Sequence, residues 1–144
     1  MLNKVRIKKW FYELLVHEAT HAFLARHLTN VHVVPWVNEG LADYMAAELV
    51  PGCWAKRKYV EATREAVRTK RGVAHVFNGV GTSAFDYGIA QSFVRYLIHR
   101  NRKTFIRFVT LLKEGKTDEQ ALQEAYGLTR RAFVKSWRKT VSRK

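Results

Sequence analysis

Apolar and polar residues follow one another at helical spacing along nearly the whole chain. Between residues 8 and 28, apolar side chains recur three and four positions apart, which is typical of an amphipathic helix. The same pattern returns in later segments, separated by Pro, Gly and polar stretches. We therefore predict a mainly α fold with helices over residues 8–28, 37–49, 54–70, 86–98, 101–114, a short segment ending at Gly127, and a last segment following Thr129.

Helix-start signals support these boundaries. Pro35 stands just before the second helix, a position that its fixed φ favours. Ser83 and Asp86 form a capping-box-like start, and Thr117 forms a full capping box with Gln120. Each of these signals predicts a helix that begins directly after it.

The segment 72–83 is the longest break in the helical pattern. It contains Gly79 and Gly81 together with polar residues, so we expect a flexible loop that could form a lid or rim over a cleft. His75 in this segment could serve as a proton donor or oxyanion stabiliser, although a loop histidine is more often uninvolved. Residues 31–34 are too short and too close to Pro35 to be assigned as a strand.

The first helix carries the candidate chemistry, His17-Glu18-Ala19-Thr20-His21. Residues four apart lie about 40° apart around a helix, so His17 and His21 share a face and could hold a metal ion. Glu18 falls about 60° beyond His21, where it could take a proton from a metal-bound water. The alternative is a solvated helix face with two histidines. The apolar residues 11–16 favour a buried helix instead, where unpaired histidines would be costly.

A second carboxylate follows in the next helix. A connection of about eight residues allows this helix to fold back antiparallel on the first. Glu39 could then complete a His-His-Glu site with water in the fourth position. Asp43, one turn further on, could accept the second ring N–H of a ligand histidine, which we expect to be His17. The alternative is an ordinary acidic helix face.

His17-Glu18-x-x-His21 followed by Asn38-Glu39-Gly40-Leu41-Ala42-Asp43 resembles the gluzincin metallopeptidases, the peptidase MA-like group related to thermolysin and the zinc aminopeptidases. The resemblance covers roughly residues 8 to 137 and is specific over 17–43 and 86–97. It implies a zincin-like helical domain with two active-site helices and a C-terminal helical subdomain. It also implies Zn²⁺ held by His17, His21 and Glu39, with Glu18 as general base in peptide-bond hydrolysis.

The resemblance also draws attention to Tyr87, at the start of the helix over 86–98. In these enzymes a tyrosine on a comparable helix donates a hydrogen bond to the oxyanion. The alternative is a core tyrosine with its hydroxyl at the rim. Thermolysin and aminopeptidase relatives place a β-sheet before the motif helix. Only sixteen residues precede His17, so we expect that sheet to be absent or reduced.

A rival assignment, the metzincins, requires a third histidine six residues after the second. His27 occupies that place. Those enzymes need a glycine midway to bend the chain, and this sequence has Leu24 there. A straight helix would turn His27 about 240° from His21, away from the metal. The sequence therefore does not support a metzincin.

Length and composition set the remaining limits. The 144 residues, of which 47% are hydrophobic, suggest one folded domain over 1–144, with the zinc-binding helices in 1–50 and a helical C-terminal part in 51–144. The single Cys53 excludes an internal disulfide framework and is expected to be a packing residue. No apolar run approaches the roughly 18 residues of a membrane span, and no signal peptide is evident, so we expect a cytoplasmic protein.

The chain is strongly basic, with a net charge of +14. A surplus of this size attracts polyanions, so nucleic acid is a possible partner besides a protein or peptide substrate. The alternative function is therefore a basic nucleic-acid-binding module with a structural or vestigial zinc site.

Overall fold

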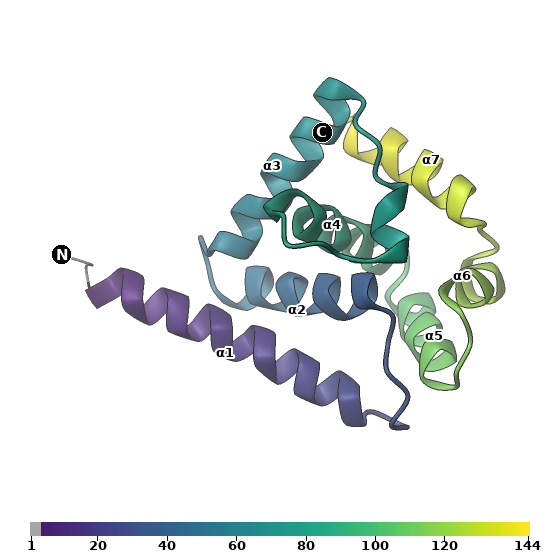
Figure 1. Ribbon diagram of the computed structural model, residues 1–144, viewed down its shortest axis with the longest axis horizontal. Helices are drawn as coiled ribbons and strands as arrows, with labels where there is room; N and C mark the ends of the chain where they lie inside the picture. The colour runs from purple at the N-terminus through teal and green to yellow at the C-terminus, as the bar shows by residue number, and fades with distance from the viewer. Residues whose placement is uncertain (1–3) are drawn as a thin grey trace.

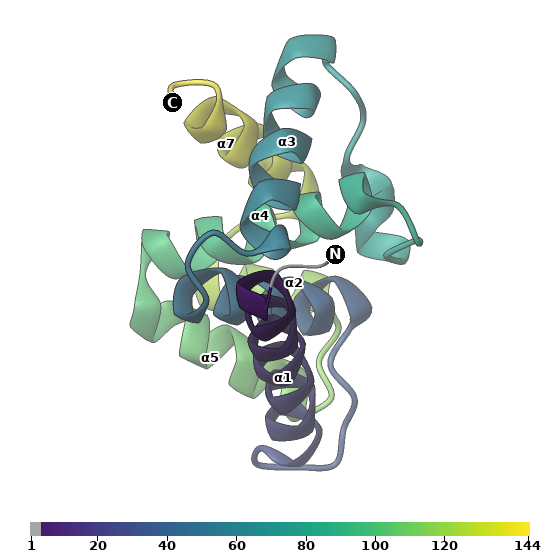
Figure 2. The ribbon, with the colours of Figure 1, turned by 90° about the vertical axis from the view of Figure 1, so that its left-hand side faces the viewer.

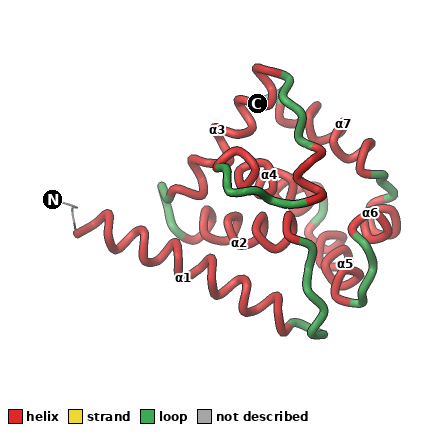
Figure 3. Tube along the Cα trace, viewed as in Figure 1, coloured by secondary structure: helices red, strands yellow, loops and turns green. Residues whose placement is uncertain are grey.

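The computed structural model describes residues 4–144, and over that range the protein contains seven α-helices and no strand (Figures 1 and 3). The helices are α1 (Lys4–Arg26), α2 (Pro35–Leu49), α3 (Trp54–Thr69), α4 (Ala84–Arg100), α5 (Arg102–Lys113), α6 (Asp118–Tyr126) and α7 (Arg130–Val141), with a short 3₁₀ helix, η1 (Ala74–Asn78), before α4. The predicted mainly α fold is confirmed. The first helix is longer at its start than predicted, and Pro35 is the first residue of α2 rather than lying before it.

Helix α4 lies at the centre of the fold, with α2 and α3 packed against it. Two glycines allow this close packing. A Cβ at Gly40 of α2 would lie 2.5 Å from the carbonyl oxygen of Ala90, and a Cβ at Gly88 of α4 would lie 2.4 Å from the carbonyl oxygen of Lys58. The backbones therefore approach one another at a distance that no larger residue would permit.

The core is dominated by aromatic side chains around Trp36, which is fully buried. Its indole Nε1 donates to Asp118 Oδ2 at 2.8 Å, and Arg130 binds the other oxygen of the same carboxylate at 2.6 Å. This buried indole is thereby provided with a partner, as buried polar groups require. The contact joins α2 to α6 and α7.

Helix α1 lies at the edge of the molecule, alongside α2 (Figures 1 and 2). Among its residues only Leu24 is buried, whereas Trp10, Leu15 and Phe23 are 62%, 53% and 61% exposed. The prediction of a buried first helix is therefore wrong. The apolar residues of α1 lie all around the helix, so those that do not face α2 remain in solvent.

Two anchors fix α1 on either side of its histidines. One turn before His17, the carboxylate of Glu13 accepts the backbone N–H groups of Trp54 and Ala55, at 3.1 and 2.7 Å, at the N-terminus of α3. Near its end, the buried ammonium group of Lys113 donates to the carbonyl oxygens of Leu24 and Val31, both at 2.6 Å. The segment that contains the motif is thus held at both ends.

The segment 72–83 is not the flexible loop that the sequence suggested. Val73, Val76 and Phe77 are buried, and Phe77 stacks on Phe93 of α4 with ring centroids 5.2 Å apart. Apolar side chains placed between the glycines hold the segment against the core. Residues 73–77 are therefore not part of a free lid, whereas residues 81–83 remain an exposed loop.

The caps at Ser83 and Thr117 form as predicted. Ser83 Oγ accepts the N–H of Asp86, and both hydrogen bonds of the capping box between Thr117 and Gln120 are present. Cys53 is a free thiol packed in the core, and burial raises its pKa. None of the helices described is both long enough and apolar enough to cross a membrane.

Candidate metal centre

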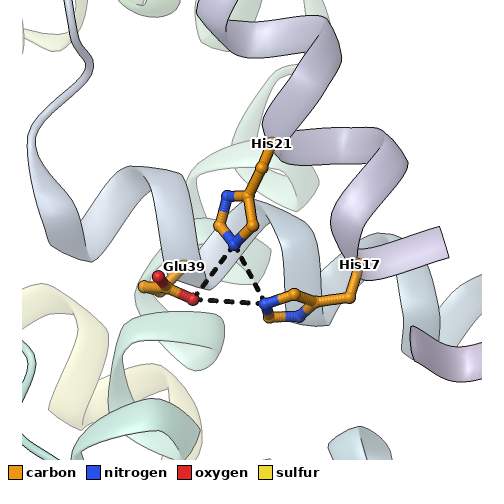
Figure 4. Close-up of side chains that lie close together, drawn as sticks. All are labelled: His17, His21 and Glu39. Atoms are coloured by element: carbon orange, nitrogen blue, oxygen red, sulfur yellow. Dashed lines mark hydrogen bonds and ion pairs between the residues drawn. The ribbon is translucent and has the colours of Figure 1, made fainter. Parts of the chain in front are cut away.

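The two histidines of α1 and a glutamate of α2 converge on one point (Figure 4). His17 and His21 lie one turn apart on the face of α1 that meets α2. Their Nε2 atoms are 3.0 Å apart, and Glu39 Oε2 lies 3.3 Å from each of them. The three atoms form a nearly regular triangle, as the sequence predicted.

The other ring nitrogen of each histidine is already engaged. His17 Nδ1 lies 2.9 Å from Asp43 Oδ1, and His21 Nδ1 lies 2.9 Å from Asn38 Oδ1. Both partners are acceptors, so each Nδ1 carries the proton and donates. In the neutral imidazoles both Nε2 atoms are then acceptors, and they face each other and a carboxylate oxygen. Such a group of three acceptors with no donor between them requires a cation or an additional proton.

The dimensions of the triangle fit a tetrahedral metal site. Donors bound at about 2.1 Å in a tetrahedral arrangement lie about 3.4 Å apart. The observed separations of 3.0 to 3.3 Å are close to this value. Two imidazole nitrogens and one carboxylate oxygen are ligands suited to Zn²⁺. The three side chains remain 18–25% exposed, so solvent reaches the triangle.

Asp43 is 3% exposed and links the site to α3. Its Oδ2 accepts from the ammonium group of Lys58 at 2.9 Å. Burial acts to raise the pKa of Asp43, but the hydrogen bond from His17 and the charge of Lys58 outweigh it, so this pKa lies below its usual range. The hydrogen bond to Asp43 in turn raises the pKa of His17 against the effect of burial, and the charges of Glu39 and Glu18 add to this.

Glu18 is exposed on α1, directly beside His17. It makes no hydrogen bond or ion pair with any residue in the range 4–144, although its charge contributes to the raised pKa of His17. The carboxylate of Glu18 is therefore unpaired, exposed to solvent and close enough to His17 to act on its pKa. This placement is compatible with the role of a base, which must reach a water molecule rather than another side chain.

Tyr87, in the first turn of α4, is half-buried on the side of the site formed by α2 and α3. The ammonium group of Lys58 lies 5.1 Å from the centroid of its ring. Burial raises the pKa of Tyr87, and the negative charges of Glu39 and Asp43 raise it further. The phenol is therefore protonated at neutral pH and able to donate a hydrogen bond, but no described residue accepts it.

The two other histidines considered from the sequence lie outside this cluster. His75 Nε2 pairs with Asp86 Oδ1 at 2.7 Å, at the N-terminus of α4. This contact joins His75 to the first turn of α4 and leaves it outside the group of candidate metal ligands. His27 follows the end of α1 and stacks on Phe23 at 4.9 Å, so it does not join the metal ligands. The rejection of a metzincin site is thus consistent with the geometry.

Two supporting residues were not predicted for this site. Asn38, which the sequence marked only as the residue before Glu39 in the gluzincin-like motif, orients His21. Lys58, to which the sequence assigned no role, binds Asp43. Asn38 could have been found from its place one residue before Glu39, since Asn38 and Glu39 both point from the same turn of α2 toward α1. No local signal could identify Lys58, because its contact depends on how α3 packs.

No protein-family model matches the chain, and comparisons with curated proteins and with solved structures find no match either. Within residues 4–144, His17, His21 and Glu39 are the one group of three His, Cys, Asp or Glu side chains whose donor atoms lie within 4.8 Å of one another. These three side chains are therefore the candidate metal ligands of the described residues.

Proposed function

We propose that the protein is a zinc-dependent metallopeptidase of the gluzincin type. The observation that carries the proposal is the triangle formed by His17 Nε2, His21 Nε2 and Glu39 Oε2, in which three acceptors face one another while both Nδ1 atoms are engaged elsewhere. The antiparallel pair α1 and α2 supplies the two active-site helices of a zincin-like domain. The exposed position of Glu18 supports its assignment as general base.

The reaction is hydrolysis of a peptide bond by a water molecule. When bound, the zinc ion supplies Lewis-acid chemistry, which lowers the pKa of a water toward about 7 and polarises the scissile carbonyl. A carboxylate oxygen of Glu18 accepts the proton from the attacking water and returns it to the leaving amine nitrogen. The phenol of Tyr87 donates a hydrogen bond to the negative charge that develops on the carbonyl oxygen, an interaction worth about 2.7–4 kcal/mol in comparable sites.

The metal assignment is tested by measuring zinc per chain after dialysis against a zinc buffer. We expect about one ion per chain in the wild type and a loss of at least about tenfold in affinity for Glu39→Gln, because one charged ligand is removed. Glu61→Gln is the matched control, since Glu61 is exposed on α3 and makes no ion pair with a described residue. Equal zinc binding by wild type and Glu39→Gln would refute the ligand set.

The catalytic assignment is tested with a casein-type protease assay, with and without a chelator. Glu18→Gln is expected to keep its zinc and to lose turnover by about 10² or more, because the base is removed while the ligands stay. Undiminished proteolysis in this variant would refute the role of Glu18. The zinc content of the same preparation separates a lost base from a lost metal.

The basic surface keeps a second function open, a nucleic-acid-binding module in which the metal is structural. The observation in its favour is the net charge of +14. A protein that holds zinc, has no peptidase activity in the wild type and binds DNA with a steep salt dependence would support this function instead.

A further inference from the structure

A surface pocket of about 650 Å³ lies between α3, α4 and the end of α7. It is lined by side chains from residues 59–68 of α3, from residues 92–100 of α4, and by Thr140, Val141, Ser142 and Lys144. None of His17, His21, Glu39 or Asp43 lines it, so it is separate from the metal centre. We call it the arginine pocket. A volume of this size is typical of a site for a small molecule.

The lining is strongly basic. Arg64 and Arg68 reach it from α3, and Arg95 and Arg100 reach it from α4, whereas no aspartate or glutamate lines it. Arg64, Arg68 and Arg100 form no ion pair with any residue between 4 and 144. Three guanidinium groups around one hollow without a carboxylate among them leave a positive charge that the fold itself does not neutralise.

Arg95 differs from the other three arginines because its side chain is largely buried in the wall of the pocket. Its side chain is 13% exposed, it pairs with Glu48 at 2.9 Å, and its guanidinium lies over the rings of Tyr44 and Tyr59 at 4.8 and 4.4 Å. Its buried Nε nevertheless has no hydrogen-bond partner. This nitrogen is shielded from solvent, so Arg95 contributes a fixed positive charge to the pocket rather than a free hydrogen-bond donor.

The positive charge also has a local cost. Arg64 and Arg68 are four residues apart on α3, so they are neighbours on the same helix face. Like charges at this spacing repel each other and destabilise a helix. An anion bound between them would remove the repulsion, and the planar guanidinium groups match the oxygens of a phosphate or a carboxylate.

The rest of the lining is apolar. Val60 and Val67 of α3 and Val141 of α7 line the pocket, together with the rings of Tyr59 and Tyr96. A bare inorganic ion would leave this surface uncovered. An aromatic or aliphatic body bearing an acidic group would use both parts of the lining.

We propose that the arginine pocket binds a small organic anion, an apolar or aromatic body that carries a phosphate or a carboxylate. The acidic group lies against the guanidinium groups of Arg64, Arg68 and Arg100, and the body lies against the valine and tyrosine side chains. The site is independent of the proposed peptidase activity, because it shares no residue with the metal centre.

The proposal is tested by calorimetric titration of the protein, without added zinc, with four probes. AMP carries an aromatic body and a phosphate, 2-naphthoate carries an aromatic body and a carboxylate, adenosine lacks the charge, and inorganic phosphate lacks the body. We expect AMP or 2-naphthoate to saturate one site per chain. Adenosine and inorganic phosphate should bind about tenfold or more weakly, because adenosine lacks the charged contact and phosphate lacks the apolar one. Saturation by one of the two organic anions identifies the acidic group that the pocket selects. No saturable binding of either would overturn the proposal.

Variants separate the pocket from the general charge of the surface. A triple variant should bind the organic anion at least about tenfold more weakly; it combines Arg64→Gln, Arg68→Gln and Arg100→Gln. The matched control combines Lys103→Gln, Arg131→Gln and Lys135→Gln, which removes the same charge from exposed positions outside the pocket. An equal loss in both triple variants would overturn the proposal, since the probe would then respond to net charge alone. An unchanged zinc content and helical circular dichroism would show that both variants are folded.

Discussion

His17 donates a hydrogen bond from Nδ1 to Asp43 Oδ1 at 2.9 Å, and the second oxygen of the same carboxylate accepts from Lys58. One buried carboxylate therefore joins α1, α2 and α3. It fixes the tautomer of His17 with Nε2 free, and Lys58 keeps the carboxylate ionised. The orientation of a candidate metal ligand on α1 thus depends on a lysine of α3.

The first prediction concerns this carboxylate. Asp43→Asn keeps the size of the side chain but removes its charge, so His17 is oriented less firmly and its nitrogen becomes a weaker donor. We expect the zinc affinity to fall by about 10- to 100-fold, measured by competition with a chelator of known affinity.

Asp86→Asn is the matched control for that substitution. Asp86 also pairs with a histidine, His75, at 2.7 Å, but outside the metal centre. Its zinc affinity should equal that of the wild type. If Asp43→Asn kept full affinity as well, Asp43 would have no part in orienting His17.

The convergence of His17, His21 and Glu39 could be predicted because it depends on local geometry. A four-residue spacing places two side chains on one helix face whatever the rest of the chain does. The short connection between the helices then allows few positions for Glu39 other than opposite that face. The position of Asp43 could be predicted from the same helical periodicity, because Asp43 lies one turn after Glu39 on α2.

The features that were wrong or missed depend on tertiary packing. Whether Leu15 is buried depends on which elements lie beside α1, and the sequence of α1 does not contain that information. Phe77 is buried because it stacks on Phe93 of α4, a contact between separate segments of the chain. The glycines within this segment made it resemble a free loop. Its packing partner lies in a separate part of the sequence, so the local composition could not reveal the contact.

The second prediction tests the exposure of α1. Leu24→Ala should lower the free energy of unfolding by about 2–5 kcal/mol, because Leu24 is 2% exposed and its removal leaves a cavity. Leu15→Gln should change it by no more than about 0.5 kcal/mol, because Leu15 is 53% exposed and both residues are good helix formers. Urea unfolding followed by circular dichroism measures both values. A large loss for Leu15→Gln would mean that this face of α1 is covered.

The third prediction concerns the contact between α2 and α4. A Cβ at Gly40 would lie 2.5 Å from the carbonyl oxygen of Ala90 and 2.8 Å from Cγ2 of Val94, so Gly40→Ala forces the two helices apart. We expect a net loss of about 1–3 kcal/mol in the free energy of unfolding, despite the better helix propensity of alanine. Because Gly40 adjoins Glu39, the zinc affinity should fall as well.

Gly72→Ala is the control for this substitution. No atom lies within 4 Å of a Cβ built there, and its φ is not in the left-handed region. Its free energy of unfolding should be unchanged or slightly raised. A stability of Gly40→Ala equal to that of Gly72→Ala would show that α2 and α4 do not approach as closely as described.

The last prediction uses His99, which lines the arginine pocket. Burial lowers its pKa, and nearby cations lower it further against the opposing charge of Glu48; these cations are Arg95, Lys144 and Arg102. A titration followed by NMR should therefore place the pKa of His99 below 6.5, the ordinary value.

The folded protein then binds fewer protons at His99 than the unfolded chain does. The contribution of His99 to stability is accordingly present above the ordinary pKa and decreases as the pH falls from that value through the folded one. An anion bound in the pocket offsets the neighbouring cations, so a saturating organic anion should raise the pKa of His99. A pKa of His99 at or above 6.5 in the absence of anion would contradict the positive potential on which this prediction depends, because neighbouring cations can only disfavour the imidazolium form.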